Sequence, residues 1–266
     1  MSVAVRIALQ RDPDVARASL ATSATALAVA LLAAAAETPA RGVHASAAWP
    51  FLLAGLLSPG AAQVLVTLAI RAAGSSRVSM VLGTAPLVSV TIALLVLGEP
   101  ARLPVLAGAV LVVAGALELA RERARPPHLR RLGLLYAFAG VVLFAVRDNL
   151  VRHLATAGTA VPPGVAAAAA LLGGTVLIAL WARELPGSRW LRFVPAGLLF
   201  GGSYVSLFEA YYRGRVTVVA PLVAIESLAG VALSALFLRD SELVGRRLVV
   251  GAGLIVAGGT LIGALR

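Results

Sequence analysis

Long apolar runs, separated by short segments rich in Arg, Pro and Gly, constrain this chain more than any other feature. Hydrophobic residues make up 60% of its 266 residues, charged residues only 13%, and the mean hydropathy is +0.94. A soluble domain carries about 25% charged and 45–50% apolar residues. Runs this long and this apolar cannot form a surface in contact with water. We therefore predict an all-α integral membrane protein that crosses the inner or plasma membrane several times.

A helix needs about 20 mostly apolar residues to cross a bilayer, and nine segments of this chain meet that requirement. They are residues 15–36, 48–71, 77–98, 103–121, 132–152, 162–183, 191–212, 216–238 and 243–265. The longest connection between them is ARERARPPHLRR (120–131), whose Pro126-Pro127 pair would break any helix. This segment is the predicted linker between two halves.

The two halves resemble each other at a fixed spacing of 141 residues. Residues 4–11 align with 145–152 with five identities in eight positions, and Trp49 falls on Trp190. In the last segment the spacing is 143, where GAVLVVAG (108–115) aligns with GAGLIVAG (251–258). Only three tryptophans occur in the chain and two of them align, so chance is a poor explanation. We predict an internal repeat.

The repeat predicts how many helices each half contains and how the halves are oriented. The second half holds five spans and the first half four, preceded by residues 1–11, which match the last third of 132–152. We therefore expect the sequence to begin inside a helix that the repeat requires. An odd number of spans per repeat makes the two halves run in opposite directions across the membrane. The prediction is a ten-helix inverted-repeat fold lacking most of its first helix, with about nine transmembrane helices. Its parts are 1–121 as first repeat, 122–131 as linker and 132–266 as second repeat.

Charge and composition exclude several classes of function. The formal charge of +11 comes from 23 basic residues, all arginine, which lie mainly between apolar runs, where a bilayer tolerates them. A nucleic-acid partner is therefore not expected. The chain has no cysteine and no lysine, and its three histidines are isolated, so thiol catalysis and histidine or thiolate metal sites are not expected. No nucleophile–base constellation is present either. We predict no enzyme activity, no metal and no cofactor.

Acidic residues inside apolar spans point to a binding site, because they are costly there unless they face a cavity or a partner. Asp148 has Arg152 four residues later, in the favourable order for a helical ion pair. Two interpretations stay open for it: a structural pair, or a cavity role together with Asn149. Glu226 is mid-span with no basic residue within two turns, so it could exchange protons with a cavity or bond to another helix. Glu209 is one turn before Arg213, which favours a helix-end pair.

Aromatic, polar and kinking residues complete the candidate site. Gly201, Tyr204, Phe208 and Tyr211 share one stripe of a helix, and Tyr204 and Phe208 are predicted substrate contacts. Gln63 and Thr67 share a face of 48–71, and Gln63 is the predicted contact there. Pro86 and Pro221 interrupt apolar helices, as is common where gates bend. The spacing of Gly197 and Gly201 permits close helix approach.

The sequence resembles the drug/metabolite transporter superfamily, specifically its EamA-type duplicated domain. The resemblance rests on APLVSVTIALLVLGEP (85–100), on the following GAVLVVAG, and on their echo in IESLAGVALSALFLRDSELVGRRLVVGAGLIVAG (225–258). It covers nearly the whole chain, but Ile225-Glu226-Ser227 lacks the proline that usually follows the acidic residue there. The resemblance implies a carrier for small organic metabolites such as amino acids.

We expect a secondary transporter, an exporter by alternating access, with possible coupling to protons through Glu226 and with a monomeric or homodimeric state. A flippase for lipid-linked substrates and a non-transporting membrane scaffold are the alternatives. Orientation stays open: 16 of the 23 arginines lie on the linker side, which favours a cytoplasmic linker. The resemblance implies a cytoplasmic C-terminus. Because the C-terminus and the linker lie on opposite sides of the membrane, the two indications conflict.

Overall fold

The computed structural model describes residues 1–41, 45–98, 103–120, 131–157, 161–183, 188–223, 225–238 and 245–264, and within these ranges every regular element is a helix. The first half contains α1 (Ser2–Arg11), α2 (Val15–Arg41), η1 (Ala45–Ala47), α3 (Trp49–Gly55), η2 (Leu56–Ala61), α4 (Ala62–Ala73), α5 (Ser75–Leu82), α6 (Ala85–Val96) and α7 (Leu103–Ala120). The second contains α8 (Arg131–Thr156), α9 (Pro163–Ala182), η3 (Ser188–Arg192), α10 (Val194–Arg213), α11 (Val216–Val223), α12 (Ile225–Phe237) and α13 (Arg246–Ala264).

The predicted spans correspond to these helices, singly or as consecutive pieces. Among the described residues, five stretches are long and apolar enough to cross a membrane by length and composition: Val15–Pro39, Trp49–Ala73, Ser75–Val96, Arg131–Thr156 and Pro163–Ala182. Large apolar side chains are exposed on outward surfaces, among them Leu95 at 81% and Leu32 at 73%. Such exposure suits contact with lipid rather than with water. The all-α membrane fold is confirmed, and the chain is a multi-pass membrane protein.

Within the described residues, two of the spans are interrupted near their middle. In the first, Ser58 has a non-helical backbone (φ −147°, ψ 117°) before Pro59, between α3 and α4. In the second, Gly83 and Thr84 separate α5 from α6. The predicted span 216–238 contains α11, which ends at Val223, and α12, which begins at Ile225; residue 224 lies outside the described ranges. Proline lacks the amide N–H that continues a helix, so Pro59 explains the first interruption, which the sequence-based prediction does not include.

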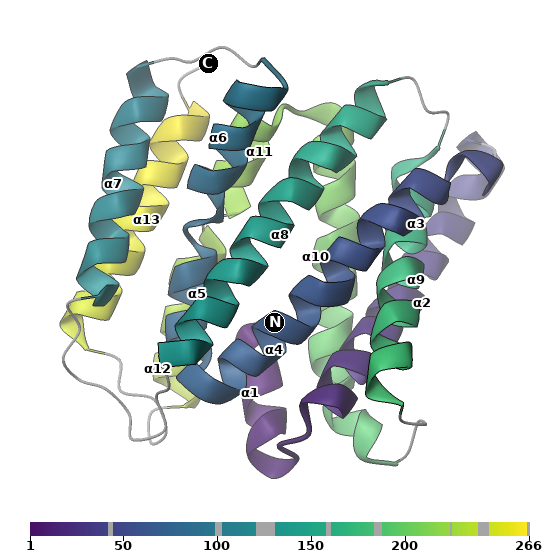
Figure 1. Cartoon of the computed structure of the whole chain (residues 1–266), viewed down its shortest axis with the longest axis horizontal. Helices are drawn as coiled ribbons and strands as arrows, with labels where there is room; N and C mark the ends of the chain where they lie inside the picture. The colour runs from purple at the N-terminus through teal and green to yellow at the C-terminus, as the bar shows by residue number, and fades with distance from the viewer. Residues whose placement is uncertain are drawn as a thin grey trace.

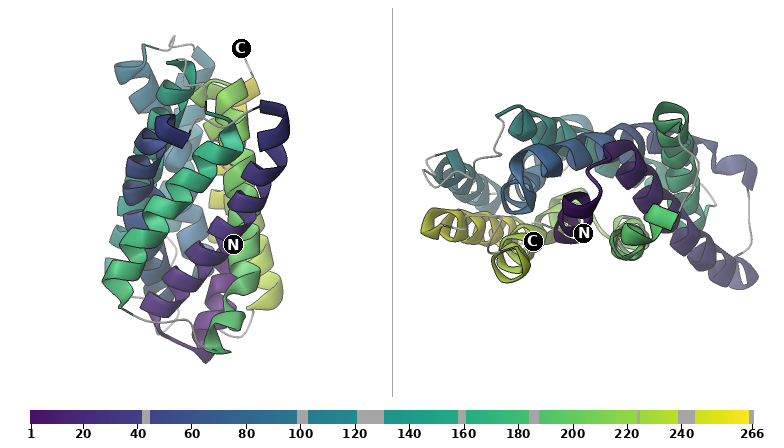
Figure 2. Two further views of the ribbon diagram at one scale, coloured as in Figure 1. Left: turned by 90° about the vertical axis from the view of Figure 1, so that its right-hand side faces the viewer. Right: turned by 90° about the horizontal axis from the view of Figure 1, so that it is seen from below.

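The helices lie in two layers. Figures 1 and 2 show α4, α5, α7 and α8 in one layer and α1, α10 and α12 in the other. The interrupted span of α5 and α6 meets α11 and α12 across the layers: α5 packs against α12, and α6 packs against α11. At one edge α7 lies along α13, and at the other α2 packs against α9 and α10.

The short helix α1 occupies a place between longer helices. Seen from below it lies between α10 and α12 (Figure 2), and it contacts both, as well as α4 and α5. Buried Arg6 of α1 donates from Nη1 to the carbonyl oxygens of Ile70 and Arg71, at 3.4 Å each. These carbonyls belong to the last turn of α4, whose partial negative charge favours a cation. The contact joins the end of α4 to the start of the chain.

Small residues allow the closest helix approach, as the spacing of Gly197 and Gly201 predicts. A Cβ on Gly201 would lie 2.9 Å from the backbone of Ala26, and one on Gly197 would lie 2.9 Å from the carbonyl oxygen of Thr22. Both glycines therefore face α2. Without an aqueous hydrophobic effect between helices in lipid, such close packing is a main source of association.

Candidate functional site

Three consecutive polar residues of α8 are all buried. Arg147, Asp148 and Asn149 are exposed by only 4%, 6% and 4%. Consecutive helical residues point in directions about 100° apart, so protein surrounds most of this turn of α8. Arg147 lies nine residues before the end of α8, or about 13 Å, which places it inside the apolar part of the span. A charge at this depth requires a partner.

The partner of Arg147 is the adjacent Asp148. Arg147 Nε donates to Asp148 Oδ1 at 2.8 Å. The guanidinium also lies 4.8 Å from the centre of the Tyr204 ring and 5.5 Å from that of Phe144. Aromatic faces attract cations, and more strongly where water is excluded. The result is a buried arginine held by one carboxylate and two rings.

Asp148 and Asn149 are tied to α6. Ser89 of α6 donates from Oγ to Asp148 Oδ2 at 3.4 Å, and its carbonyl oxygen accepts from Asn149 Nδ2 at 3.0 Å. Asn149 Nδ2 also donates to the carbonyl oxygen of Ala145 at 2.9 Å. The second helix of an interrupted span, α6, is thus joined to α8 at the charged turn.

Several buried polar atoms on α8, and on η2 and α4, which pack against it, have no hydrogen-bond partner within the described part of the chain. They are Arg147 Nη1, Asn149 Oδ1, Ser58 Oγ, and both side-chain amide atoms of Gln63. Leaving a buried donor or acceptor unpaired costs about 1–3 kcal/mol. A cluster of such atoms is therefore suited to a polar ligand or to water, which would supply the missing hydrogen bonds.

The predicted aromatic contacts Tyr204 and Phe208 border the same cluster. The Tyr204 hydroxyl donates to the carbonyl oxygen of Ser58 at 2.7 Å. The backbone carbonyl at the interruption before Pro59 therefore has a hydrogen-bond donor. The Tyr204 and Phe208 rings stack at 4.9 Å, and Phe208 continues to Phe51 of α3 at 6.4 Å. The structure thus brings Tyr204, Phe208, Asp148 and Asn149 together. Gln63 is fully buried on α4, the first helix after the Ser58 interruption.

The other predicted residues lie elsewhere. Glu226 is in the first turn of α12, and its side chain is exposed. Helix α12 packs mainly against α5, α13 and α1, so Glu226 does not belong to the Arg147 cluster. Pro86 lies in the first turn of α6, just after an interruption. Pro221 precedes the end of α11, and its side chain lies outside the described parts.

The pair of Asp148 with Arg152 is not formed. Arg152 instead donates to the carbonyl oxygens of Tyr211 at 3.0 Å and Tyr212 at 3.4 Å, in the last turn of α10. The unpaired carbonyls and partial negative charge of a helix end attract it there. Arg147 is a candidate site residue that is absent from the predicted substrate contacts. The signal was present, since Arg147 aligns with the buried Arg6 in the repeat. Glu209 does pair with Arg213, as predicted.

A known protein family matches nearly the whole chain. The chain matches the model of the EamA-like transporter family over residues 1–120 and 131–264. The chain belongs to the EamA-like transporter family. Members of this family are transporters, and the two matched segments correspond to a duplicated domain. The predicted boundaries at residues 121 and 132 stay a prediction.

Among solved structures, 17 chains match. One crystal structure, described only as that of a protein, is 22% identical and aligns over 99% of this chain and 95% of that chain with a TM-score of 0.69. At this identity the likeness concerns the fold. No curated protein matches the chain.

Proposed function

We propose that this chain is a secondary transporter that exports small organic metabolites such as amino acids across the cell membrane by alternating access. The observation that carries the proposal is the buried cluster around Arg147 and Asp148, with unpartnered donors and acceptors inside an apolar helix bundle. Membrane transporters place substrate sites near the middle of the bilayer, next to interrupted helices.

The cluster has the chemistry that a small zwitterion requires. Arg147 Nη1 can donate to a substrate carboxylate, and Asp148 can accept from a substrate ammonium group, so the net charge of the buried site would not change. The stacked rings of Tyr204 and Phe208 offer an apolar surface to the rest of the substrate. Gln63 adds a buried side-chain amide on α4, which packs against α8.

Glu226 is the proposed proton-coupling residue. Its carboxylate is exposed in the first turn of α12, a helix that packs against α5 across the layers. Protonation at such a position can change how two helices pack, which is how a pH gradient would drive the transport cycle.

The test is flux of labelled amino acids in proteoliposomes with and without a pH gradient. We expect saturable flux in the wild-type protein, loss of flux in R147Q, and in E226Q flux that no longer responds to the pH gradient. The exposed R213Q serves as the control, since Arg213 is 72% exposed at the end of α10. Absence of flux for every small metabolite, with lipid movement instead, would favour the flippase alternative and contradict the proposal.

A further inference from the structure

A cavity of about 610 Å³ opens where α1 ends and α2 begins, away from the Arg147 cluster. Its walls come from the α1–α2 junction, from Leu68 and Arg71 near the end of α4, from Trp181 near the end of α9, and from Arg189 of η3. These are all ends of spans on the side of the membrane where α8 begins. The cavity therefore lies at the level of the lipid headgroups.

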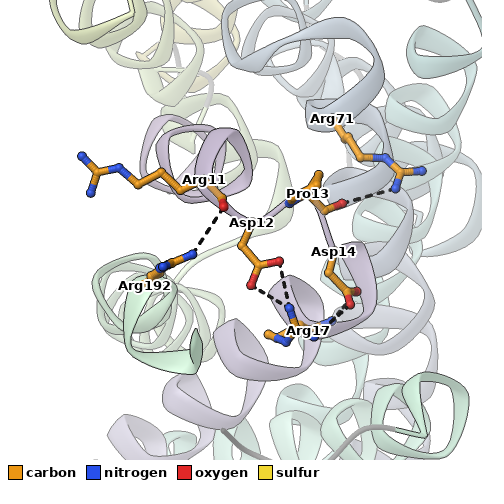
Figure 3. Close-up of polar contacts among 7 residues, drawn as sticks. All are labelled: Arg11, Asp12, Pro13, Asp14, Arg17, Arg71 and Arg192. Carbon is orange, nitrogen blue, oxygen red and sulfur yellow. Dashed lines mark hydrogen bonds and ion pairs between the residues drawn. The ribbon is translucent and has the colours of Figure 1, made fainter. Parts of the chain in front are cut away.

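The aspartates of the cavity are already paired within the chain. Arg17 donates from Nη1 to both oxygens of Asp12, at 2.8 and 2.7 Å, and its Nη2 lies 3.2 Å from Asp14 Oδ2. Asp12 is only 5% exposed, so this part of the wall is closed. Figure 3 shows Arg17 between the two carboxylates.

The remaining charged groups of the wall are exposed arginines. Arg71 makes one long contact, from Nη1 to the carbonyl oxygen of Pro13 at 3.4 Å, and Arg189 is exposed on η3. Arg192 approaches from the other side and donates to the carbonyl oxygen of Arg11 at 3.3 Å (Figure 3). The cavity thus combines a paired carboxylate region with two exposed guanidinium groups, those of Arg71 and Arg189.

The apolar part of the wall consists mainly of Trp181 and Leu68. Trp181 is 50% exposed one residue before the end of α9, and Leu68 is half-buried on α4. Tryptophan is enriched where headgroups meet acyl chains, because its ring is apolar and its N–H is polar. A soluble anion would use the arginines but gain nothing from these two side chains.

We propose that this cavity binds the headgroup of an anionic phospholipid. The phosphate lies between Arg71 and Arg189, and the glycerol backbone and first acyl carbons contact Trp181 and Leu68. Each arginine near an anionic lipid surface contributes a modest, additive attraction, and a guanidinium matches phosphate oxygens in two-point geometry. The bound lipid would join the α1–α2 junction to the ends of α4 and α9.

The test is native mass spectrometry of the full chain in detergent, titrated with phosphatidylglycerol or with phosphatidylcholine of the same acyl chains. We expect preferential binding of one phosphatidylglycerol, weakened about ten- to thirtyfold in R71Q/R189Q. The matched control R213Q/R215Q removes two exposed arginines at the opposite membrane face and should leave binding unchanged. Equal binding of both lipids, or equal weakening in both double variants, would overturn the proposal.

Two further arms exclude a soluble ligand and a folding defect. Glycerol 3-phosphate at millimolar concentration should not displace the lipid; displacement would assign the cavity to a soluble phosphate instead. Phosphatidylglycerol brominated on its acyl chains should quench part of the tryptophan fluorescence of the unaltered protein, and W181F should lack that quenched part. An unchanged quenched fraction in W181F would contradict the placement of the lipid, whatever the stability of the arginine variants.

Discussion

The ion pair of Arg147 and Asp148 shows how single residues hold the candidate site together. Each charge is tolerable inside the span only because the other is 2.8 Å away. Removing one partner leaves a buried charge uncompensated, whereas removing both leaves two neutral side chains. The cost of a substitution here therefore depends on what happens to the partner.

We expect D148N to lower the free energy of unfolding by about 3–5 kcal/mol, because Arg147 loses its carboxylate. The double variant R147Q/D148N should be more stable than D148N alone, since no buried charge remains. Thermal unfolding in detergent measures both. R213Q is the control: its pair with Glu209 is largely exposed, and a loss of no more than about 1 kcal/mol is expected. A double variant less stable than D148N would contradict the pairing.

Tyr204 contributes through its hydroxyl and its ring separately. Y204F should cost about 1 kcal/mol of unfolding free energy, because the carbonyl of Ser58 loses its donor while the stack on Phe208 remains. Y204A also removes the ring over Arg147 and should cost about 3–5 kcal/mol. Comparing the two in the same unfolding assay tests this order; equal losses would mean that the hydroxyl carries the whole contribution.

At the scale of elements, interruptions and close contacts decide how the helices meet. The break at Ser58 exposes a carbonyl that Tyr204 of α10 uses, so a local defect in one span becomes a contact to another. The glycines of α10 bring it against α2 on one face only, since a Cβ on Gly202 would meet nothing within 4 Å.

This difference gives a matched pair of substitutions on one helix. G201A should destabilise the protein by about 1–3 kcal/mol, because the added methyl group meets the backbone of Ala26. G202A should be neutral or stabilising by up to about 1 kcal/mol, because alanine is the better helix former and space is open. Thermal unfolding of the two variants side by side decides the matter; equal effects would show that α10 does not pack on α2 through Gly201.

At the scale of the whole molecule, the two halves meet where α5 and α6 pack against α12 and α11. On one side of the membrane α5 packs against α12, with Ser75 Oγ and Ser234 Oγ 2.8 Å apart. On the other side α6 packs against α11. If transport alternates access to the site, as proposed above, one of these two contacts opens in each state.

A cysteine cross-link between α5 and α12 should therefore stop transport. The chain has no cysteine of its own, so S75C/S234C introduces the only pair. We expect flux to fall at least tenfold on oxidation and to recover on reduction. The control S23C/T175C links α2 to α9, where Ser23 Oγ and Thr175 Oγ1 are also 2.8 Å apart. This cross-link should leave flux unchanged. Full flux through the oxidised S75C/S234C protein would mean that α5 and α12 do not separate.

The amino-acid sequence by itself determined the membrane character, the positions of the spans and the family. These follow from local properties, since apolar run length is compared with a fixed bilayer thickness and the repeat is visible in aligned tryptophans and glycines. Tyr204, Phe208, Asp148 and Asn149 stand out as candidates for the same reason, since polar or aromatic residues inside a span are visible in the sequence, and their role in binding stays a prediction.

Only the tertiary structure decided the partners. Asp148 pairs with Arg147 rather than Arg152 because the end of α10 offers Arg152 two carbonyls, which helical spacing along α8 cannot reveal. The exposed position of Glu226 outside the Arg147 cluster depends on how α12 packs. The cavity at the α1–α2 junction joins residues more than a hundred positions apart. Partner choice depends on helix crossing and on competition among distant groups, and neither is encoded in local spacing.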